Sequence, residues 1–115
     1  MRVKIFHNPR CSKSRQTLAI LQERGIDPEI VRYLDEPPDA ETLRDLLSRL
    51  GLTAAQLIRR GEKEYRELGL DAAGVDENDL VRAMVEHPRL IQRPIVVAGG
   101  KARLGRPPEA VLEIL

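Results

Sequence analysis

Cysteine, aromatic residues and long apolar runs are all scarce in this sequence. Its single cysteine, Cys11, has no second cysteine with which to form an internal disulfide. Aromatic residues make up 3 % of the chain and Trp is absent, which argues against nucleic-acid binding by base stacking. No apolar run approaches the roughly 20 residues that span a bilayer, and the N-terminal apolar stretch is too short for a signal peptide. These absences favour the reducing cytoplasm, where a lone thiol stays free.

Acidic residues are missing from the first part of the chain, although the whole chain has a formal net charge of +1. The balanced total gives no reason to expect a nucleic-acid or membrane partner. Residues 1–22 contain no acid, and the first is Glu23. The same stretch carries the basic residues Arg2, Lys4, Arg10, Lys13 and Arg15. Cys11 is therefore expected to lie in a local positive field.

The length and the balance of residue types fit one globular domain. The chain has 115 residues, of which 42 % are hydrophobic and 32 % are charged. We therefore predict a single domain over residues 1–115, without a metal site and acting as a monomer.

Hydrophobic periodicity and turn residues predict the element order β-α-β, several helices, β-hairpin, α. Strands are expected around residues 3–6 and 30–33, and a hairpin at 95–98 and 101–104 across Gly99 and Gly100. Helices are expected at 12–24, at 40–50 after the N-cap Asp39, at 54–61 after Thr53, at 62–68, between Asp76 and Pro88, and after Pro107 and Pro108. The first two strands should be parallel, with a helical crossover, and the hairpin adds two antiparallel strands. The prediction is an α/β, thioredoxin-like fold: a four-stranded mixed sheet flanked by helices, with a mostly helical insertion over about residues 35–90.

Cys11 falls between the first predicted strand and the first predicted helix. A thiol at a helix N-terminus faces unpaired backbone N–H groups, which lower its pKa and also bind anions. Cys11 and Ser14 form a C-x-x-S pattern, so Ser14 stands where a resolving cysteine would be. An outside thiol must therefore resolve any adduct at Cys11. The alternative, a small buried apolar cysteine, is disfavoured by polar neighbours on both sides.

Three polar residues of the same segment are further candidates. His7 lies four residues before Cys11 on the same predicted loop and either holds a proton or positive charge near the thiolate, or shapes the loop by bonding the backbone. Asn8 and Ser14 either hydrogen-bond the thiolate or shape the loop.

Three arginines are candidate oxyanion ligands, because a guanidinium presents a planar fork and stays charged. Arg93 precedes Pro94, which in a thioredoxin-like fold is expected to be cis and to face the cysteine. Arg106 follows the hairpin, and Arg59 is expected at the end of a helix in the insertion. Taken singly, each arginine is more often a solvated surface residue.

Four segments together resemble the glutaredoxin-dependent arsenate reductase (ArsC) family. They are His7-Asn8-Pro9-Arg10-Cys11-Ser12-Lys13-Ser14-Arg15, Leu57-Ile58-Arg59, Arg93-Pro94-Ile95-Val96-Val97 and Gly105-Arg106-Pro107-Pro108-Glu109 with the residues up to Leu115. The resemblance covers essentially the whole chain. It implies that a cysteine thiolate attacks arsenate and that glutathione, a co-substrate and not a bound cofactor, attacks the adduct. Glutaredoxin then completes reduction to arsenite.

By the same resemblance Cys11 is the nucleophile, and Arg59, Arg93 and Arg106 bind arsenate or a related oxyanion. His7 and Ser14 match positions that support the thiolate. Because Arg60 follows Arg59, the register of that contact is open by one residue.

Two other functions remain open at this point. One is a general glutathione-dependent thiol oxidoreductase of the same fold. The other is a Spx-type regulator that binds RNA polymerase; such regulators typically use a C-x-x-C switch, which Ser14 removes here.

Overall fold

The computed structural model describes residues 2–115. Contacts within the chain divide it into two compact units. The sheet unit comprises the residues up to 36 and residues 93–115, and the helical unit comprises residues 37–92. The helical unit matches the predicted insertion within two residues at each end.

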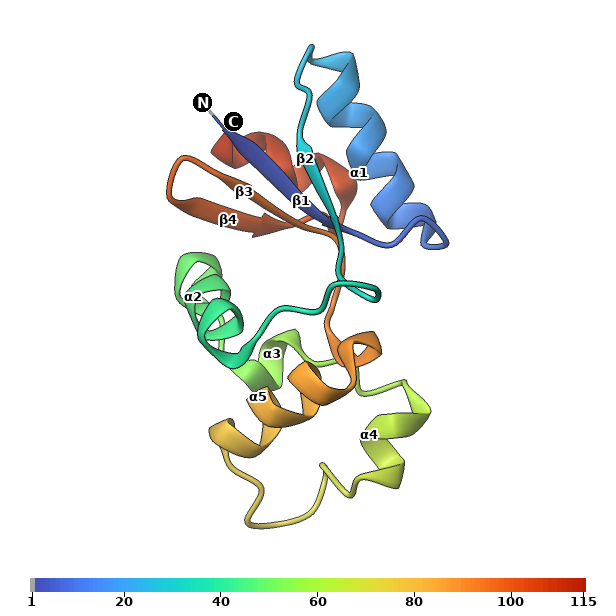
Figure 1. Cartoon of the computed structure of the whole chain (residues 1–115), viewed down its shortest axis with the longest axis vertical. Coiled ribbons are helices and arrows are strands. Elements are labelled where there is room, and N and C mark those ends of the chain that lie inside the picture. The colour runs from blue at the N-terminus through green and yellow to red at the C-terminus, as the bar shows by residue number, and fades with distance from the viewer. Residues whose placement is uncertain (1) are drawn as a thin grey trace. The chain divides into compact units, whose positions relative to one another are not determined.

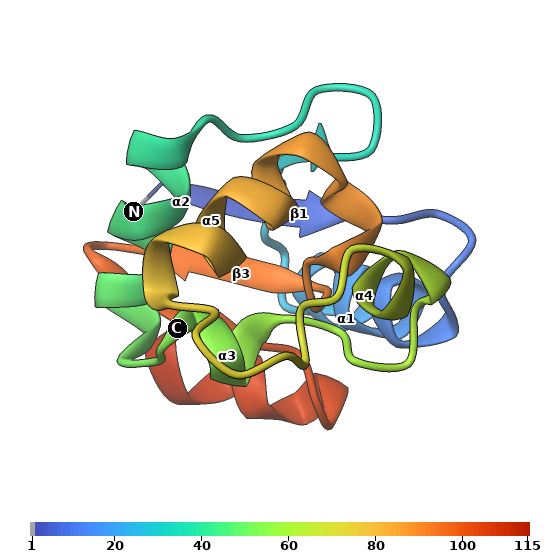
Figure 2. The same ribbon diagram turned by 90° about the horizontal axis from the view of Figure 1, so that it is seen from below.

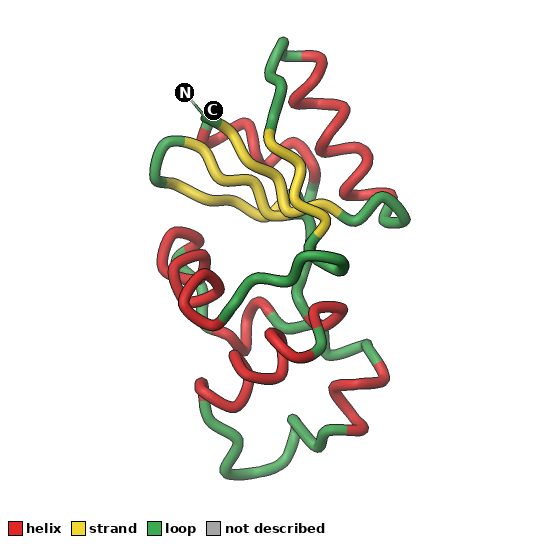
Figure 3. The backbone as a smooth tube through the Cα atoms, in the orientation of Figure 1, coloured by secondary structure: helices red, strands yellow, loops and turns green. Residues whose placement is uncertain are grey.

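The sheet unit contains all four named strands of the described residues (Figures 1 and 3). Its elements are β1 (Val3–His7), α1 (Ser12–Glu23), β2 (Glu29–Arg32), β3 (Ile95–Ala98), β4 (Lys101–Leu104) and the 3₁₀-helix η2 (Pro108–Ile114). The strand order is β2-β1-β3-β4. β1 pairs parallel with β2 and antiparallel with β3, which pairs antiparallel with β4. The predicted four-stranded mixed sheet of a thioredoxin-like fold is therefore confirmed.

Strand register determines which side chains form the core of this unit. Ile5 pairs with Val96 in the sheet, and both side chains are completely buried. They form one cluster with Leu21 of α1 and Val111 of η2. The two helices therefore cover the same face of the sheet, and α1 is held at a fixed position at the end of β1.

The boundaries of the helices in this unit follow from their end residues. α1 begins after Cys11 and ends before Gly25, whose φ of +74° is the left-handed conformation that favours glycine. The last helix was expected to be an ordinary α-helix, but it is 3₁₀. Ala110 N–H donates to the carbonyl of Pro107 at 2.9 Å, a three-residue spacing. Proline at the first helical position is compatible with either helix type, because the N–H that it lacks would have no partner within the helix, so the local sequence does not distinguish the two.

The helical unit contains α2 (Ala40–Leu50), α3 (Ala54–Leu57), α4 (Lys63–Glu67), α5 (Glu77–Glu86) and the 3₁₀-helix η1 (Pro88–Leu90). The three predicted caps are present: Asp39 accepts from the N–H of Thr42, and Thr53 and Asp76 each begin a capping box. α5 packs against α2 and α3 (Figure 2). The buried apolar residues of these three helices include Leu43, Leu46, Leu47, Leu57, Leu80, Val81 and Met84.

One predicted helix is shorter than expected. α3 ends at Leu57, not near residue 61. Ile58 instead forms an antiparallel bridge with Ile91, and Arg59 N–H donates to the carbonyl of Leu90 at 2.7 Å. The backbone partners come from a distant segment of the chain, so the local pattern alone did not show them. Arg59 consequently lies in extended chain after the helix, not at the helix end.

Among residues 2–115, no helix is both long and apolar enough to cross a membrane.

Candidate active site

The loop between β1 and α1 is fixed by its own hydrogen bonds. Cys11 N–H donates to the carbonyl of Asn8 at 3.0 Å, and Arg10 N–H donates to Asn8 Oδ1 at 3.0 Å. Arg15 on α1 donates from Nη1 to the carbonyl of Pro9 at 2.9 Å. These contacts place Cys11 at the N-cap of α1, with its side chain half-buried. The observed role of Asn8 is therefore to shape the loop.

Ser14 connects the loop to the strand before it. Its side chain is fully buried, its Oγ accepts from Asn8 N–H at 3.0 Å, and it lies 2.6 Å from His7 Nδ1. Since Oγ accepts from Asn8, its own proton is free to be donated to His7 Nδ1. Ser14, which stands where a resolving cysteine would be, thus supplies two contacts, one to the loop at Asn8 and one to the end of β1 at His7.

His7 is the last residue of β1 and is 5 % exposed, so the prediction that it lies on the loop was wrong. Burial lowers the pKa of His7, and the nearby Arg32 and Arg15 guanidinium groups lower it further. A neutral ring at pH 7 follows. This disfavours a positive charge beside the thiolate, and the contact that the ring makes is with the side chain of Ser14, not with the backbone as the alternative role had it.

The thiol of Cys11 is shifted toward its anionic form. Burial acts to raise its pKa, but the backbone N–H groups of Ser14 and Lys13 and the charged Arg93 side chain together outweigh burial. The pKa of Cys11 therefore lies below its usual value. A thiolate is the nucleophilic form of cysteine, so the local structure activates this residue.

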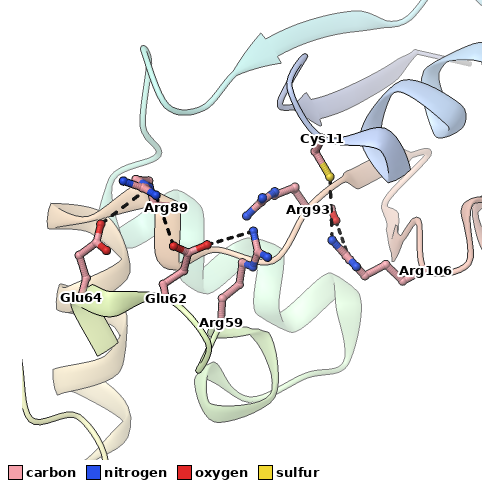
Figure 4. Close-up of polar contacts among 7 residues, drawn as sticks. All are labelled: Cys11, Arg59, Glu62, Glu64, Arg89, Arg93 and Arg106. Carbon is pink, nitrogen blue, oxygen red and sulfur yellow. Dashed lines mark hydrogen bonds and ion pairs between the residues drawn. The ribbon is translucent and has the colours of Figure 1, made fainter. Parts of the chain in front are cut away.

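Arg93 and Arg106 are brought together by the β3–β4 hairpin. Beyond the last ladder pair, Gly105 N–H donates to the carbonyl of Pro94 at 3.0 Å, and Arg106 Nε donates to the carbonyl of Arg93 at 2.9 Å. Arg106 Nη2 lies 4.0 Å from Cys11 Sγ, and the two side chains point toward each other (Figure 4). The Arg93–Pro94 bond is cis, as predicted, and so is Arg106–Pro107.

Two residues that the sequence did not single out hold this arrangement in place. Thr17 is completely buried in α1 and donates from Oγ1 to the carbonyl of Lys13 at 2.8 Å. A Cβ on Gly105 would lie 2.7 Å from Cγ of Pro94 and would overlap Oγ1 of Thr17. Gly105 is therefore required for the close packing of α1 against the two arginine segments. The position of Gly105 directly before Arg106 is the one signal that the sequence carried.

Arg59 belongs to the helical unit, and its contacts are given separately from those of Cys11, Arg93 and Arg106. Its Nη1 is buried and lies 3.4 Å from Oε1 of Glu62, whereas Arg60 is exposed. Of the two adjacent arginines, Arg59 thus has the restrained guanidinium. Its contact with an oxyanion stays a prediction.

Comparison with known proteins agrees with this geometry. The sequence profile of the ArsC family matches residues 6–114. The chain belongs to the ArsC family. It is 59 % identical over 114 residues to the Escherichia coli protein YfgD, with 98 % of this chain and 96 % of YfgD covered. It is 52 % identical over 114 residues to a Neisseria meningitidis serogroup B protein named arsenate reductase, with 98 % and 97 % covered.

A solved structure of an ArsC-family relative has the same fold throughout. An arsenate reductase from Vibrio cholerae superposes with a TM-score of 0.97 at 51 % identity, covering 100 % of this chain and 98 % of that one. In the chain described here, the ArsC fold presents a thiol of lowered pKa beside two guanidinium groups. Such a site can bind an oxyanion, offset its negative charge and present a sulfur nucleophile to its central atom.

Proposed function

We propose that this protein reduces arsenate to arsenite and that Cys11 is the nucleophile. The observation that carries the proposal is the placement of Cys11 Sγ at the N-cap of α1, 4.0 Å from Arg106 Nη2, with Arg93 lowering its pKa. Relatives that are named arsenate reductase at 46–52 % identity, aligned over nearly the whole chain, support the choice of substrate.

The first step forms one bond and breaks one. The thiolate of Cys11 attacks arsenic(V), an arsenic–sulfur bond forms, and one arsenate oxygen leaves as water after taking up protons. Arsenic is still pentavalent at this point. Arg93 and Arg106 offset the negative charge of the incoming oxyanion. Without these two arginines, that charge would repel the anionic sulfur of Cys11. We include Arg59 as a third ligand of the oxyanion.

Reduction then needs two electrons, which two thiols supply when they become a disulfide. Arsenate and two thiols give arsenite, one disulfide and water. The chain has one cysteine, so at least one thiol must come from another molecule. We assign that role to glutathione, with glutaredoxin removing the glutathione afterwards. Because Cys11 must return to a free thiol after each turnover, we place the reaction in the reducing cytoplasm.

The test measures arsenite formed from arsenate by the purified protein, with each thiol component left out in turn. Turnover is expected with glutathione and glutaredoxin together, and none when either is absent. Turnover that requires thioredoxin instead would overturn the glutathione assignment and leave arsenate reduction standing. Absence of arsenite with every reductant would overturn the proposed function.

A pair of arginine variants separates arsenate reduction from general thiol–disulfide exchange. Arg106→Ala should raise the KM for arsenate, because it removes a cation beside Sγ. Arg103→Ala removes the same charge from β4, where Arg103 pairs with Glu113 at 2.8 Å, and should leave the KM unchanged. Equal KM values in both variants would favour a thiol oxidoreductase whose substrate is not an oxyanion.

A further inference from the structure

A line of alternating charges runs through the helical unit and ends at Arg59 (Figure 4). Arg59 Nη1 lies 3.4 Å from one carboxylate oxygen of Glu62, and Arg89 Nη2 lies 3.5 Å from the other. Arg89 Nε in turn lies 3.8 Å from Glu64. Two cations and two anions therefore alternate, and Glu62 stands between the two arginines.

Glu62, like Glu64, is well covered from solvent. Its side chain is 17 % exposed, against 59 % for Arg89. Glutamates are seldom this buried unless they are paired, because removing a carboxylate from water is costly. Glu62 is the N-cap of α4, yet its side chain does not cap that helix. Its carboxylate faces the two arginines instead.

Glu62 and Arg59 are three residues apart in the sequence, but the ion pair between their side chains is long. Glu62 N–H donates to the carbonyl of Arg59 at 3.4 Å, so a tight turn brings the two side chains together. The ion pair of 3.4 Å exceeds the roughly 2.7–2.9 Å of a charge-assisted hydrogen bond. Arg59 Nη1 is buried, and no hydrogen-bond acceptor satisfies it anywhere in residues 2–115. The position of Arg59 is thus restrained by the ion pair, while the hydrogen-bonding capacity of Nη1 is unused within residues 2–115.

We propose that Glu62 is a positioning residue for oxyanion binding: it orients the Arg59 guanidinium before the substrate arrives, and Arg89 and Glu64 hold Glu62 in turn. The inference rests on the proposed function, in which Arg59 binds the oxyanion. An arginine that is already ordered loses less rotamer freedom on binding than a mobile one. A carboxylate at 3.4 Å also yields easily to an oxyanion that offers shorter, bidentate contacts.

The test compares the KM and kcat for arsenate in Glu62→Gln with those of the wild type. Glu62→Gln keeps the shape and removes the charge, and it should raise the KM about fivefold or more with kcat within about twofold. Glu67→Gln is the matched control, since Glu67 is an exposed acid on the same helix, and it should leave both constants unchanged. Glu62→Asp should recover part of the lost affinity. The pH dependence of Cys11 alkylation should be the same in every variant.

A double variant shows whether Glu62 acts through Arg59. Arg59→Ala should raise the KM, and adding Glu62→Gln should raise it no further. A KM that is unchanged or lowered in Glu62→Gln, or that rises by the same factor in the Arg59→Ala background, would overturn the inference. If Glu62→Gln does not fold, Arg89→Gln provides the same test from an exposed position and should raise the KM by a smaller factor.

The activity of the wild type separates the positioning role of Glu62 from the proposed arsenate reduction. A wild type that forms no arsenite would overturn both. An active wild type in which Arg59→Ala raises the KM and Glu62→Gln and Arg89→Gln do not would overturn the positioning role alone.

Discussion

Gly105 offers a quantitative test of how the site is held together. In Gly105→Ala the new methyl group would lie 2.7 Å from Cγ of Pro94 and 3.2 Å from Cγ2 of Thr17. Non-bonded carbon atoms pack at about 3.5–4.0 Å, so the surrounding groups must move by roughly 1 Å. The backbone of Gly105 does not have a positive φ, so the cost is one of crowding and not of strain.

Two effects of different size are expected from this movement. Overpacking of a well-packed region costs about 1–3 kcal/mol, which for a chain of this length lowers Tm by roughly 3–15 °C. Arg106 follows Gly105 directly, and Arg93 precedes Pro94, so both guanidinium groups should shift relative to Cys11. A displacement near 1 Å at a reacting centre can reduce the rate by about 100-fold. We therefore expect kcat/KM for arsenate to fall by about tenfold to 100-fold.

The assays are thermal unfolding followed by circular dichroism and arsenite formation well below Tm. Gly61→Ala is the control for stability, because a Cβ at Gly61 meets nothing within 4 Å and its φ is not positive. Gly61→Ala should leave Tm unchanged or slightly higher. Combining Gly105→Ala with Thr17→Ala should cost less than the sum of the two single changes, because the smaller side chain relieves part of the overlap. An unchanged Tm and kcat/KM in Gly105→Ala would refute the claim that this contact sets the positions of the arginines.

Three further predictions follow from single contacts. Because the thiolate reacts and the thiol does not, the alkylation rate of Cys11 plotted against pH should have its midpoint below the usual thiol pKa. Arg93→Ala should move that midpoint to higher pH. The same midpoint in the wild type and in Arg93→Ala would contradict the role of Arg93. Ser14→Ala leaves the buried N–H of Asn8 without its acceptor and should lower the free energy of unfolding by about 1–3 kcal/mol, measured by urea denaturation, whereas no change would show that water replaces the contact. Thr53→Ala removes a helix cap and should cost about 1 kcal/mol in the same experiment; a neutral result would mean that the capping box contributes nothing to stability.

Local sequence patterns were enough to predict the sheet and the position of the nucleophile. Two short runs separated by Gly99 and Gly100 predicted the hairpin, and the break between β1 and α1 placed Cys11 at a helix N-terminus. The meeting of Arg93 and Arg106 was also accessible in principle. Arg93 lies six residues before Gly99, and Arg106 lies six residues after Gly100. The register of the hairpin therefore places the two arginines opposite each other.

Contacts between distant segments explain what the sequence did not predict. α3 ends early because its continuation pairs with Ile91, more than 30 residues away. The neutral state of His7 depends on burial and on Arg32 of a neighbouring strand. The restraint of Glu62 by Arg89 likewise joins two segments that no local motif connects.

The most direct test of the proposed chemistry is an anomalous difference map, measured at the arsenic absorption edge, from crystals soaked in arsenate without added thiol. We predict one arsenic peak at bonding distance from Cys11 Sγ, with its oxygens contacting the guanidinium groups of Arg93 and Arg106. Crystals of Cys11→Ser should show no arsenic bonded at that position. An unmodified Cys11 in the wild type, with arsenic absent from these arginines or bound elsewhere, would contradict the assignment of Cys11 as the nucleophile that attacks arsenate.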